Sequence, residues 1–246
     1  MRRVALVTGS GKKRVGNAIA VALAKAGFDL AIHYRTSKSE AEDTVKELGD
    51  LGVEAKAFRA DVGNESEVKA MVADVIAAFG RIDVLVNAAA VWQKKSLEDA
   101  TADDVKLHFE TNALGTFLLC QHVGLHMCTR STGGAIVNIG DWAEVRPYLD
   151  YAAYFPSKGA VTALTRSFAV ELASRNPNVR VNAILPGPVM LPSDLDEAER
   201  KQAIDGTLVK REGTPEHVAM AAMMLIENDF ITGVCLPVDG GRTLQS

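Results

Sequence analysis

Two side chains capable of acid–base chemistry, Tyr154 and Lys158, stand four positions apart. On a helix, residues at this spacing share one face, so the ammonium group would lie beside the phenol. A nearby positive charge stabilises phenolate and lowers the pKa of tyrosine from its free value of about 10. Tyr148 and Tyr151 have no lysine four positions further on. We therefore predict that Tyr154 transfers the proton in a reaction, with Lys158 as its partner.

A carboxylate, Asp141, precedes Tyr154 by thirteen positions and follows an apolar run that predicts a buried strand. An ionised aspartate cannot donate a hydrogen bond to a ketone oxygen, and it repels an oxyanion that develops there. It suits a substrate with N–H donors or with a ring nitrogen that must be protonated. Asp141 therefore favours C=N over C=O at the reacting centre. A strand-end acid that caps a turn is the simpler alternative.

The segments that must position these groups alternate between short apolar runs and longer amphipathic stretches. Strands are expected within residues 3–8, 29–35, 53–61, 82–88, 134–140, 179–187 and 233–241, and helices within stretches such as 17–27, 38–52, 65–80 and 159–174. Apolar runs without alternation are typical of parallel strands covered on both faces. The pattern predicts one α/β domain over residues 1–246, a Rossmann-type doubly wound sheet of about seven parallel strands flanked by helices.

The composition is that of an ordinary globular protein. The 246 residues are 48% apolar and 24% charged, with a net charge of −4 that argues against a nucleic-acid surface. No apolar run approaches the ~20 residues of a membrane span, and the first apolar run is too short for a signal peptide. Cys120, Cys128 and Cys235 form no CxxC pair. We expect a cytoplasmic protein with no metal site and no nucleic-acid or membrane partner.

A glycine-rich turn with Gly9, Gly11 and Gly16 links the first predicted strand to the following helix. Glycine lets the backbone approach a pyrophosphate, and a helix N-terminus offers free N–H groups and a positive dipole. The spacing is not GxGxxG, and the loop carries three cations at residues 12–14. The strand–turn–helix context nevertheless predicts a dinucleotide site. A tight strand–helix link is the plainer alternative.

The end of the second predicted strand indicates which dinucleotide binds. NAD-binding chains usually place an acid there to bind the ribose 2′-hydroxyl. This chain has Arg35, Thr36, Ser37 and Lys38 instead. A guanidinium group and hydroxyls suit a 2′-phosphate, so we expect NADP(H). A solvated turn before a helix capped by Ser37 or Ser39 is compatible with the same residues.

The segments TGSGKKRVG, ADV, VNAAA, NALG, YFPSK, PG and VDGG resemble, in this order, the motifs of the short-chain dehydrogenase/reductase family. The resemblance covers nearly the whole chain. It implies that Asp61 and Val62 border the adenine, that Asn112 holds a helix kink and a relay water, and that Pro186–Gly187 flank the nicotinamide. The expected catalytic residues are Asp141, Tyr154, Lys158 and Asn112. The expected cofactor-binding residues are Gly9, Lys13, Arg14, Val15, Gly16, His33, Tyr34, Arg35, Thr36, Ser37, Asp61, Val62, Asn87, Ala88, Ala89, Tyr154, Lys158, Pro186 and Gly187.

Within that family the chain is most similar to the pteridine reductases. They share the aspartate at the position of Asp141, where most members carry serine, and HYRTS resembles their HYxRS stretch. Trp92 stands where they place an aromatic ring that stacks on the pterin. Ala90 replaces a serine of theirs, and the glycine loop is one residue longer. The substrate contacts implied by the resemblance are Arg14, Trp92, Asp141 and Tyr154.

The sequence thus predicts an NADPH-dependent oxidoreductase that transfers hydride to a pteridine-like C=N substrate, with Tyr154 as proton donor. A carbonyl or 3-oxoacyl-thioester reductase of the same family is the alternative. A dinucleotide-binding regulatory protein without turnover is a further alternative, which the intact Tyr154–Lys158 pair opposes. Residues 190–213 form an irregular stretch long enough for a lid over the substrate. The resemblance also implies a homotetramer or homodimer.

Overall fold

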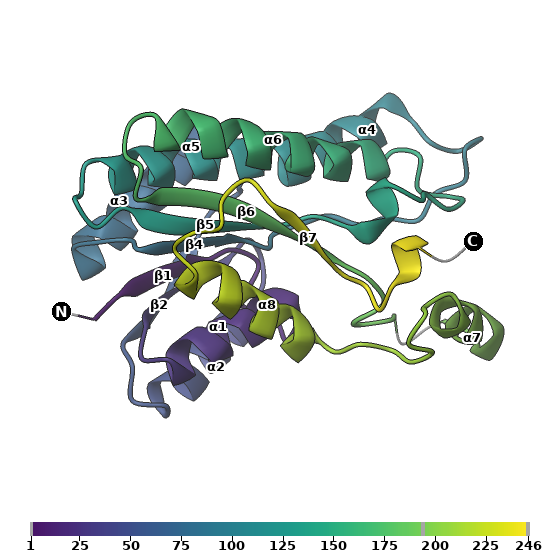
Figure 1. Ribbon diagram of the computed structural model, residues 1–246, viewed down its shortest axis with the longest axis horizontal. Helices are drawn as coiled ribbons and strands as arrows, with labels where there is room; N and C mark the ends of the chain where they lie inside the picture. The colour runs from purple at the N-terminus through teal and green to yellow at the C-terminus, as the bar shows by residue number, and fades with distance from the viewer. Residues whose placement is uncertain (1, 193–194, 245–246) are drawn as a thin grey trace.

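The chain folds into one parallel sheet with helices on both faces (Figure 1). The computed structural model describes residues 2–192 and 195–244. Within them the sheet has seven strands in the order β3-β2-β1-β4-β5-β6-β7, and every neighbouring pair is parallel. This arrangement confirms the predicted Rossmann-type doubly wound sheet. The strands are β1 Val4–Val7, β2 Asp29–Tyr34, β3 Ala55–Arg59, β4 Val84–Asn87, β5 Gly134–Ile139, β6 Val179–Pro186 and β7 Cys235–Val238.

Each face of the sheet has its own helices and its own buried cluster. On the face drawn below the sheet in Figure 1 lie α1 (Val15–Lys25), α2 (Lys38–Gly49) and α8 (Pro215–Glu227). On the other face lie α3 (Glu65–Phe79), α5 (Gly115–Cys128) and α6 (Phe155–Ala173). The central strands are buried along their length because both of their faces are covered. Their apolar runs therefore lack polar alternation.

Two short helices stand beyond the carboxyl ends of the strands, α4 (Ala102–His108) and α7 (Glu197–Asp205) (Figure 1). The stretch 190–213 was expected to be irregular, and α7 corrects that expectation. Its start is a capping box in which the side chains of Asp196 and Glu199 accept each other's backbone N–H. No residue of α7 is buried, so the helix has no apolar periodicity in the sequence. Ser193 and Asp194 of this stretch lie outside the described residues.

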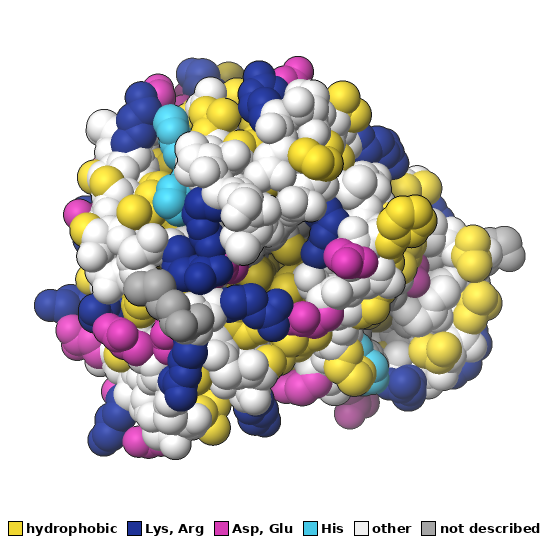
Figure 2. All heavy atoms as spheres, turned by 60° about the vertical axis from the view of Figure 1, so that its left-hand side comes forward, with side chains coloured by type: hydrophobic (Ala, Val, Ile, Leu, Met, Phe, Trp, Pro, Cys, Tyr) yellow, Lys and Arg dark blue, Asp and Glu magenta, His cyan; other side chains and the backbone are white. Residues whose placement is uncertain are grey.

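The amino ends of the strands are held together by a buried carboxylate. Asp83, which precedes β4, accepts the N–H of Val4 and the guanidinium groups of Arg81 and Arg130, at 2.6–2.9 Å. On the same side, Arg180 donates to the carbonyls of Leu225 and Ile226 in the last turn of α8. Figure 2 is turned toward this side and shows basic and acidic side chains around a hollow. These bonds satisfy backbone groups opposite the ligand-binding edge.

Candidate active site

The predicted acid, Tyr154, meets Asp141 just beyond the carboxyl end of β5. Tyr154 donates its phenolic O–H to Oδ2 of Asp141 at 2.8 Å. The other carboxylate oxygen of Asp141 accepts the N–H of Ala143 at 2.8 Å and so caps the 3-10 turn η2, Trp142–Glu144. Asp141 therefore caps a turn, as the simpler alternative expects, and also contacts Tyr154; its role toward a C=N substrate stays a prediction. Tyr154 stands at the first turn of α6 and is 4% exposed.

Lys158 follows one helical turn later on the same face of α6, as its spacing predicts. It is buried, and its Nζ donates to the carbonyl of Ile139 at 2.8 Å. Burial lowers the pKa of Lys158 to about 8, while the carboxylates of Asp141 and Glu144 oppose that effect. The amine is thus able to lose and regain its proton near neutral pH.

The pKa of Tyr154 is raised rather than lowered, which corrects the expectation drawn from the Tyr154–Lys158 pair. Burial is the largest cause, followed by the negative charge of Asp141 and the hydrogen bond to it. The Lys158 ammonium is engaged with a backbone carbonyl, and the charge in contact with the phenol is a carboxylate. Burial also raises the pKa of Asp141, against its bonds from Ala143 and Tyr154 and the charge of Lys158. Tyr154 is therefore held in the protonated form that a proton donor needs.

A third residue continues this stripe on α6 and was not found from the sequence. Thr162 lies one turn beyond Lys158, and its hydroxyl donates to Oε2 of Glu144 at the end of η2. Tyr154, Lys158 and Thr162 thus each bond to the segment 139–144. Burial raises the pKa of Glu144, against the Thr162 bond. The signal in the sequence was the spacing of four residues from Lys158 to Thr162, but its partner is not local.

Asn112 lies in the π-helical turn Phe109–Leu114, so the predicted helix irregularity is present. Its side chain accepts the N–H of Val91 at 2.8 Å and donates to the Val91 carbonyl at 3.0 Å. It also donates to the hydroxyl of Ser157 at 2.9 Å, and Ser157 donates to the carbonyl of Tyr154. Asn112 therefore ties the loop after β4 to the start of α6. Its expected relay role stays a prediction.

Aromatic side chains form the wall of the site next to Tyr154. Trp92 is 44% exposed and stacks on Tyr151, with ring centroids 5.1 Å apart and planes 11° from parallel. The rings of Tyr151 and Tyr154 meet edge-on, with centroids 6.2 Å apart. The buried ring of His108 also meets the Tyr154 ring edge-on, at a centroid distance of 5.8 Å. The packing of His108 against Tyr154 could not be read from the sequence. One face of Trp92 is used by Tyr151.

The glycine loop after β1 packs directly on the end of β4. Gly9 has φ +62°, and a Cβ there would lie 2.8 Å from Cα of Ala89. Thr8 Oγ1 accepts the N–H groups of Ala88 and Ala89 at 3.0 and 3.1 Å. A Cβ at Gly16 would also crowd the loop, at 3.0 Å from the Gly9 carbonyl. The structure thus brings together the cofactor-binding residues expected on these two strands, and the closeness of the backbones requires glycine.

His33 has a structural task at this loop. It is 3% exposed. Its Nδ1 accepts the N–H of Gly9 at 3.1 Å, and its Nε2 donates to the carbonyl of Ala60 at 3.0 Å. Burial lowers its pKa, which favours the neutral ring that this pair of bonds requires. Both ring nitrogens are used, so His33 positions the loop and offers no ring nitrogen to a cofactor in this arrangement.

The residues expected to select the dinucleotide lie at the ends of β2 and β3. Arg35 and Thr36 are exposed, and Ser37 stands at the N-cap position of α2 without a side-chain capping bond. The guanidinium group of Arg35 lies 3.6 Å from the carboxylate of Asp61. Both side chains are well exposed, so this ion pair is weak and open to exchange.

The remaining predicted cofactor residues surround this edge of the sheet. Lys13 makes an ion pair with Glu47 of α2 at 2.9 Å, while Arg14 is exposed at the start of α1. A Cβ at Gly187 would lie 2.5 Å from Cα of Asp239, so the Pro186–Gly187 turn packs closely on the segment after β7. Of the other predicted positions, Val15 begins α1, Tyr34 and Asn87 end β2 and β4, and Val62 lies in the turn after β3.

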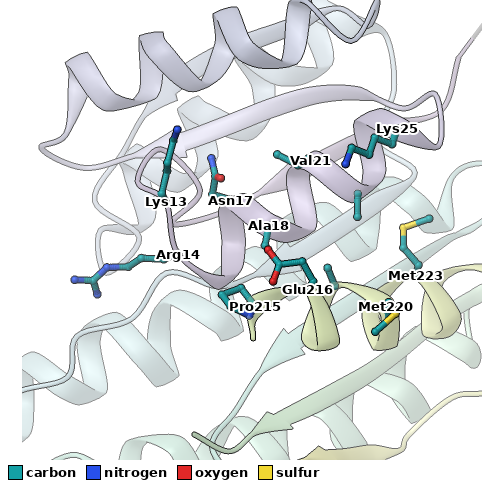
Figure 3. A pocket seen from close by; sticks show the side chains of 12 residues that line it. Lys13, Arg14, Asn17, Ala18, Val21, Lys25, Pro215, Glu216, Met220 and Met223 are labelled. Atoms are coloured by element: carbon teal, nitrogen blue, oxygen red, sulfur yellow. The ribbon is translucent and has the colours of Figure 1, made fainter. Parts of the chain in front are cut away.

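A groove of ≈ 560 Å³ runs between α1 and α8, and Tyr154 is not among its lining residues (Figure 3). Ala18, Val21 and Met220 are among its apolar lining residues, and Lys13 and Lys25 stand at its borders. Over residues 2–192 and 195–244, no group of three or more His, Cys, Asp or Glu side chains could hold a metal ion. No helix in the same ranges is long and apolar enough to span a membrane.

Comparison with known proteins gives the same architecture. A family model described as enoyl-(acyl carrier protein) reductase matches residues 10–243. The 3-oxoacyl-acyl-carrier-protein reductase FabG of Staphylococcus epidermidis is 34% identical, over 98% of this chain and 99% of its own length. Glucose 1-dehydrogenase 2 of Bacillus subtilis is 31% identical, over 98% of this chain and 95% of its own length.

Among solved structures, acetoin dehydrogenase from Enterobacter cloacae superposes with a TM-score of 0.89 at 33% identity. The match covers 100% of this chain and 97% of that one. The match to the family model and the whole-length relatives agree with the parallel sheet, the glycine loop and the Tyr154–Lys158 pair. The chain therefore belongs to the short-chain dehydrogenase/reductase family of oxidoreductases, which use nicotinamide dinucleotides.

Proposed function

We propose that this protein is an NADP(H)-dependent reductase that transfers hydride to a carbonyl group and uses Tyr154 as the proton donor. The observation that carries the proposal is the cluster of the half-buried Asp141 with the buried Tyr154 and Lys158 beyond the end of β5. The relatives support the carbonyl substrate: the Staphylococcus epidermidis protein is a 3-oxoacyl reductase and the Enterobacter cloacae protein an acetoin dehydrogenase. A 3-oxoacyl thioester is thus a reasonable first substrate to test.

The residues present fit a nicotinamide dinucleotide. Gly9 and Gly16 let the loop after β1 pack closely on β4, and the N-terminus of α1 that follows this loop suits a pyrophosphate. Oδ1 of Asn87 is buried at the end of β4 without a hydrogen-bond partner. The exposed Arg35, with the hydroxyls of Thr36 and Ser37, would hold the 2′-phosphate. NADPH supplies the hydride when it is bound.

The cluster can deliver one proton per turnover. Because burial keeps the phenol of Tyr154 protonated, it can give its proton to the substrate oxygen that becomes electron-rich. Asp141 must release the Tyr154 O–H for this step. Burial favours the protonated form of Asp141, and a carboxylic acid, unlike a carboxylate, donates a hydrogen bond. A protonated Asp141 removes the repulsion of an oxyanion that an ionised one would cause.

The second candidate function is reduction of a pteridine-like C=N substrate. The Asp141–Tyr154 hydrogen bond favours it, since a proton shared between these groups can pass to a ring nitrogen. The partly exposed ring of Trp92, stacked on Tyr151, offers a flat surface to a planar heterocycle. The two candidates share the cofactor, the acid and the lysine, and they differ in the atom that receives the proton.

The deciding experiment follows NADPH oxidation with four substrates in parallel. They are an acetoacetyl thioester, diacetyl (the diketone that is reduced to acetoin), dihydrobiopterin and dihydrofolate. We expect turnover with the ketones, loss of more than 95% of it in Tyr154→Phe, and nearly unchanged NADPH affinity in that variant, because only the proton donor is removed. Turnover confined to the pterins establishes the second candidate. NADPH binding without turnover of any ketone or pterin contradicts both and favours a regulatory dinucleotide-binding protein.

The cofactor and the assembly state have their own tests. We expect NADPH to bind more tightly than NADH, and Arg35→Glu to weaken NADPH binding by about 1–3 kcal/mol, the value of a charge-assisted contact. Equal dissociation constants for the two cofactors contradict this.

We propose a homotetramer or homodimer, because Phe117, Val170 and Met220 expose apolar side chains on α5, α6 and α8. Light scattering on the purified protein measures this directly.

A further inference from the structure

The side chains of Tyr154, Lys158 and Thr162 form a buried stripe along α6. Along α6 these residues are one turn apart, and they bond in turn to Asp141, Ile139 and Glu144. Tyr154 is 4% exposed and Lys158 is 4% exposed. Each turnover nevertheless removes a proton from this buried pair, and the proton must be replaced from outside. The structure has to provide a route for it.

Glu144 lies between the buried pair and an open pocket. With Leu97, Pro147, Phe155 and Gly159 it lines a surface pocket of ≈ 540 Å³ beside the start of α6. Its half-buried side chain is bonded inward to Thr162. A carboxylate at this place can therefore exchange protons with bulk water on one side while it stays close to the buried groups on the other.

The inner side of Glu144 faces Lys158 across one residue. Oε2 of Glu144 lies 4.0 Å from the position of a Cβ on Gly140. The preceding residue, Ile139, supplies the carbonyl that accepts the Lys158 ammonium. The carboxylate charge opposes the loss of the Lys158 proton. Lys158 thus bonds to the same short segment, 139–144, that carries Glu144.

The charged and titratable groups around Glu144 come from three elements. Lys158 and Arg166 act on it from α6, and Asp141 from the end of β5. On β7, the thiol of Cys235 is influenced by Glu144 and Arg166, and burial raises its pKa. The thiol therefore stays neutral near pH 7. A proton that reaches Glu144 can pass inward to Lys158, the one basic nitrogen of the catalytic pair.

We propose that Glu144 carries protons between solvent and Lys158 during turnover. The inference rests on the proposed reductase function and names a residue that the Tyr154–Lys158 pair alone does not require. After Tyr154 has protonated the product, the phenol is restored at the expense of the Lys158 ammonium. Glu144 in its acid form returns a proton to the neutral amine through a bridging water, and its carboxylate takes one from bulk water. One proton enters per hydride transferred, and no electrons move in these steps.

The first test is Glu144→Gln, which keeps an oxygen acceptor for Thr162 and removes the titrating group. We expect kcat to fall about tenfold, with NADPH affinity and Tm unchanged, and added formate or imidazole to restore part of the lost rate. Glu98→Gln, an exposed glutamate on the loop after β4, is the matched control and should keep native kcat. Native kcat in Glu144→Gln overturns the proposal, as does a loss of kcat that no small acid restores.

The second test needs no substrate. The ¹⁵Nζ resonance of Lys158, assigned by its loss in Lys158→Met, is titrated by NMR in ligand-free native protein and in Glu144→Gln. Since the Glu144 carboxylate raises the pKa of Lys158, we expect the midpoint to move to lower pH in the variant. An unchanged midpoint overturns the proposal. Absence of turnover in the native protein instead contradicts the reductase function, so the two failures are distinguishable.

Discussion

At the scale of single residues, Asp141 is the unusual member of the catalytic cluster. Its two oxygens accept the Tyr154 phenol and the Ala143 N–H, so it fixes both the acid and the turn η2. Burial raises its pKa, and its charge in turn raises the pKa of Tyr154. The protonation state of Asp141 therefore decides whether the cluster can receive a developing negative charge.

Asp141→Ser tests this role, because serine both caps a turn and donates a hydrogen bond. For the native protein, we expect ketone reduction to be fastest at low pH and to decline as pH rises through the raised pKa of Asp141, since ionisation removes its donor. Asp141→Ser should flatten this decline and lower C=N reduction by up to a hundredfold, equivalent to ~3 kcal/mol. Kinetic pH profiles with both substrate classes measure the effect. Profiles of the same shape in the two proteins contradict it.

The catalytic pair could be predicted because helical spacing is local. Tyr154 and Lys158 share a face whatever surrounds them. The contacts that modify them join distant positions: Glu144 bonds to Thr162 at a separation of 18 residues, and Asn112 to Val91 at 21. The expected lowering of the Tyr154 pKa failed for the same reason. That expectation took account of the neighbouring lysine but not of the burial of Tyr154 in the folded protein.

At the scale of elements, Arg242 links α7 to the ring of Trp142 in η2, next to Asp141. Arg242 donates to the carbonyls of Gln202 and Ala203 at the end of α7, and its guanidinium group lies 4.9 Å from the ring centre of Trp142. A cation that binds the last carbonyls of a helix stabilises that end. These contacts suit the role of a substrate lid, which remains a prediction for residues 190–213.

Gly206→Ala should detach this helix end. A Cβ at Gly206 would overlap Nη1 of Arg242, and the flexible guanidinium group would move away at little cost to the fold. We expect faster amide hydrogen exchange in α7, KM raised several-fold, and Tm changed by less than about 2 °C. Gly49→Ala is the control, since nothing lies within 4 Å of its added Cβ. Native exchange rates in α7 of Gly206→Ala would show that Arg242 does not restrain it.

At the scale of the whole molecule, the sheet's two edges have different tasks. The carboxyl ends carry the groups predicted to act in catalysis and cofactor binding, whereas the amino ends carry the Asp83 cluster. Burial raises the pKa of Asp83, but the bonds from Arg81, Val4 and Arg130 outweigh this and lower it below its usual value. The side chain of Asp83 is 8% exposed. This cluster therefore contributes to stability and lies away from the reaction.

Asp83→Asn should destabilise the protein by about 3 kcal/mol at pH 7, because it leaves two partly buried guanidinium groups without their counter-charge. A lowered pKa means that the stabilisation is complete above the unfolded value of about 3.9 and is lost as pH falls through the folded value. The difference in the free energy of unfolding between Asp83→Asn and the native protein should therefore shrink below pH ~4. Urea unfolding at several pH values measures it, with Asp103→Asn, whose carboxylate is exposed, as control. A difference that is independent of pH would contradict the assignment.

The overall fold was more accessible from the sequence than the lid or the site. Continuous apolar runs such as β1 and β4 report burial on both faces, so strand number and sheet type follow from pattern alone. The helix α7 gave no such signal because none of its residues is buried. His33 shows the limit at the site: a polar residue near a cofactor loop can equally be part of the scaffold, and only its two bonds distinguish these roles.

The strand order has a consequence for how such a protein can diversify. The residues predicted to bind the cofactor's 2′-phosphate, Arg35, Thr36 and Ser37, follow β2 on one flank of the sheet. The residues predicted to meet the reacting atoms, Asp141 and Tyr154, lie after β5 and at the start of α6 on the opposite flank. The groups expected to choose the coenzyme and the groups expected to transfer the proton are thus encoded in different halves of the gene. Recombination between β4 and β5 would exchange the first set and leave the second intact.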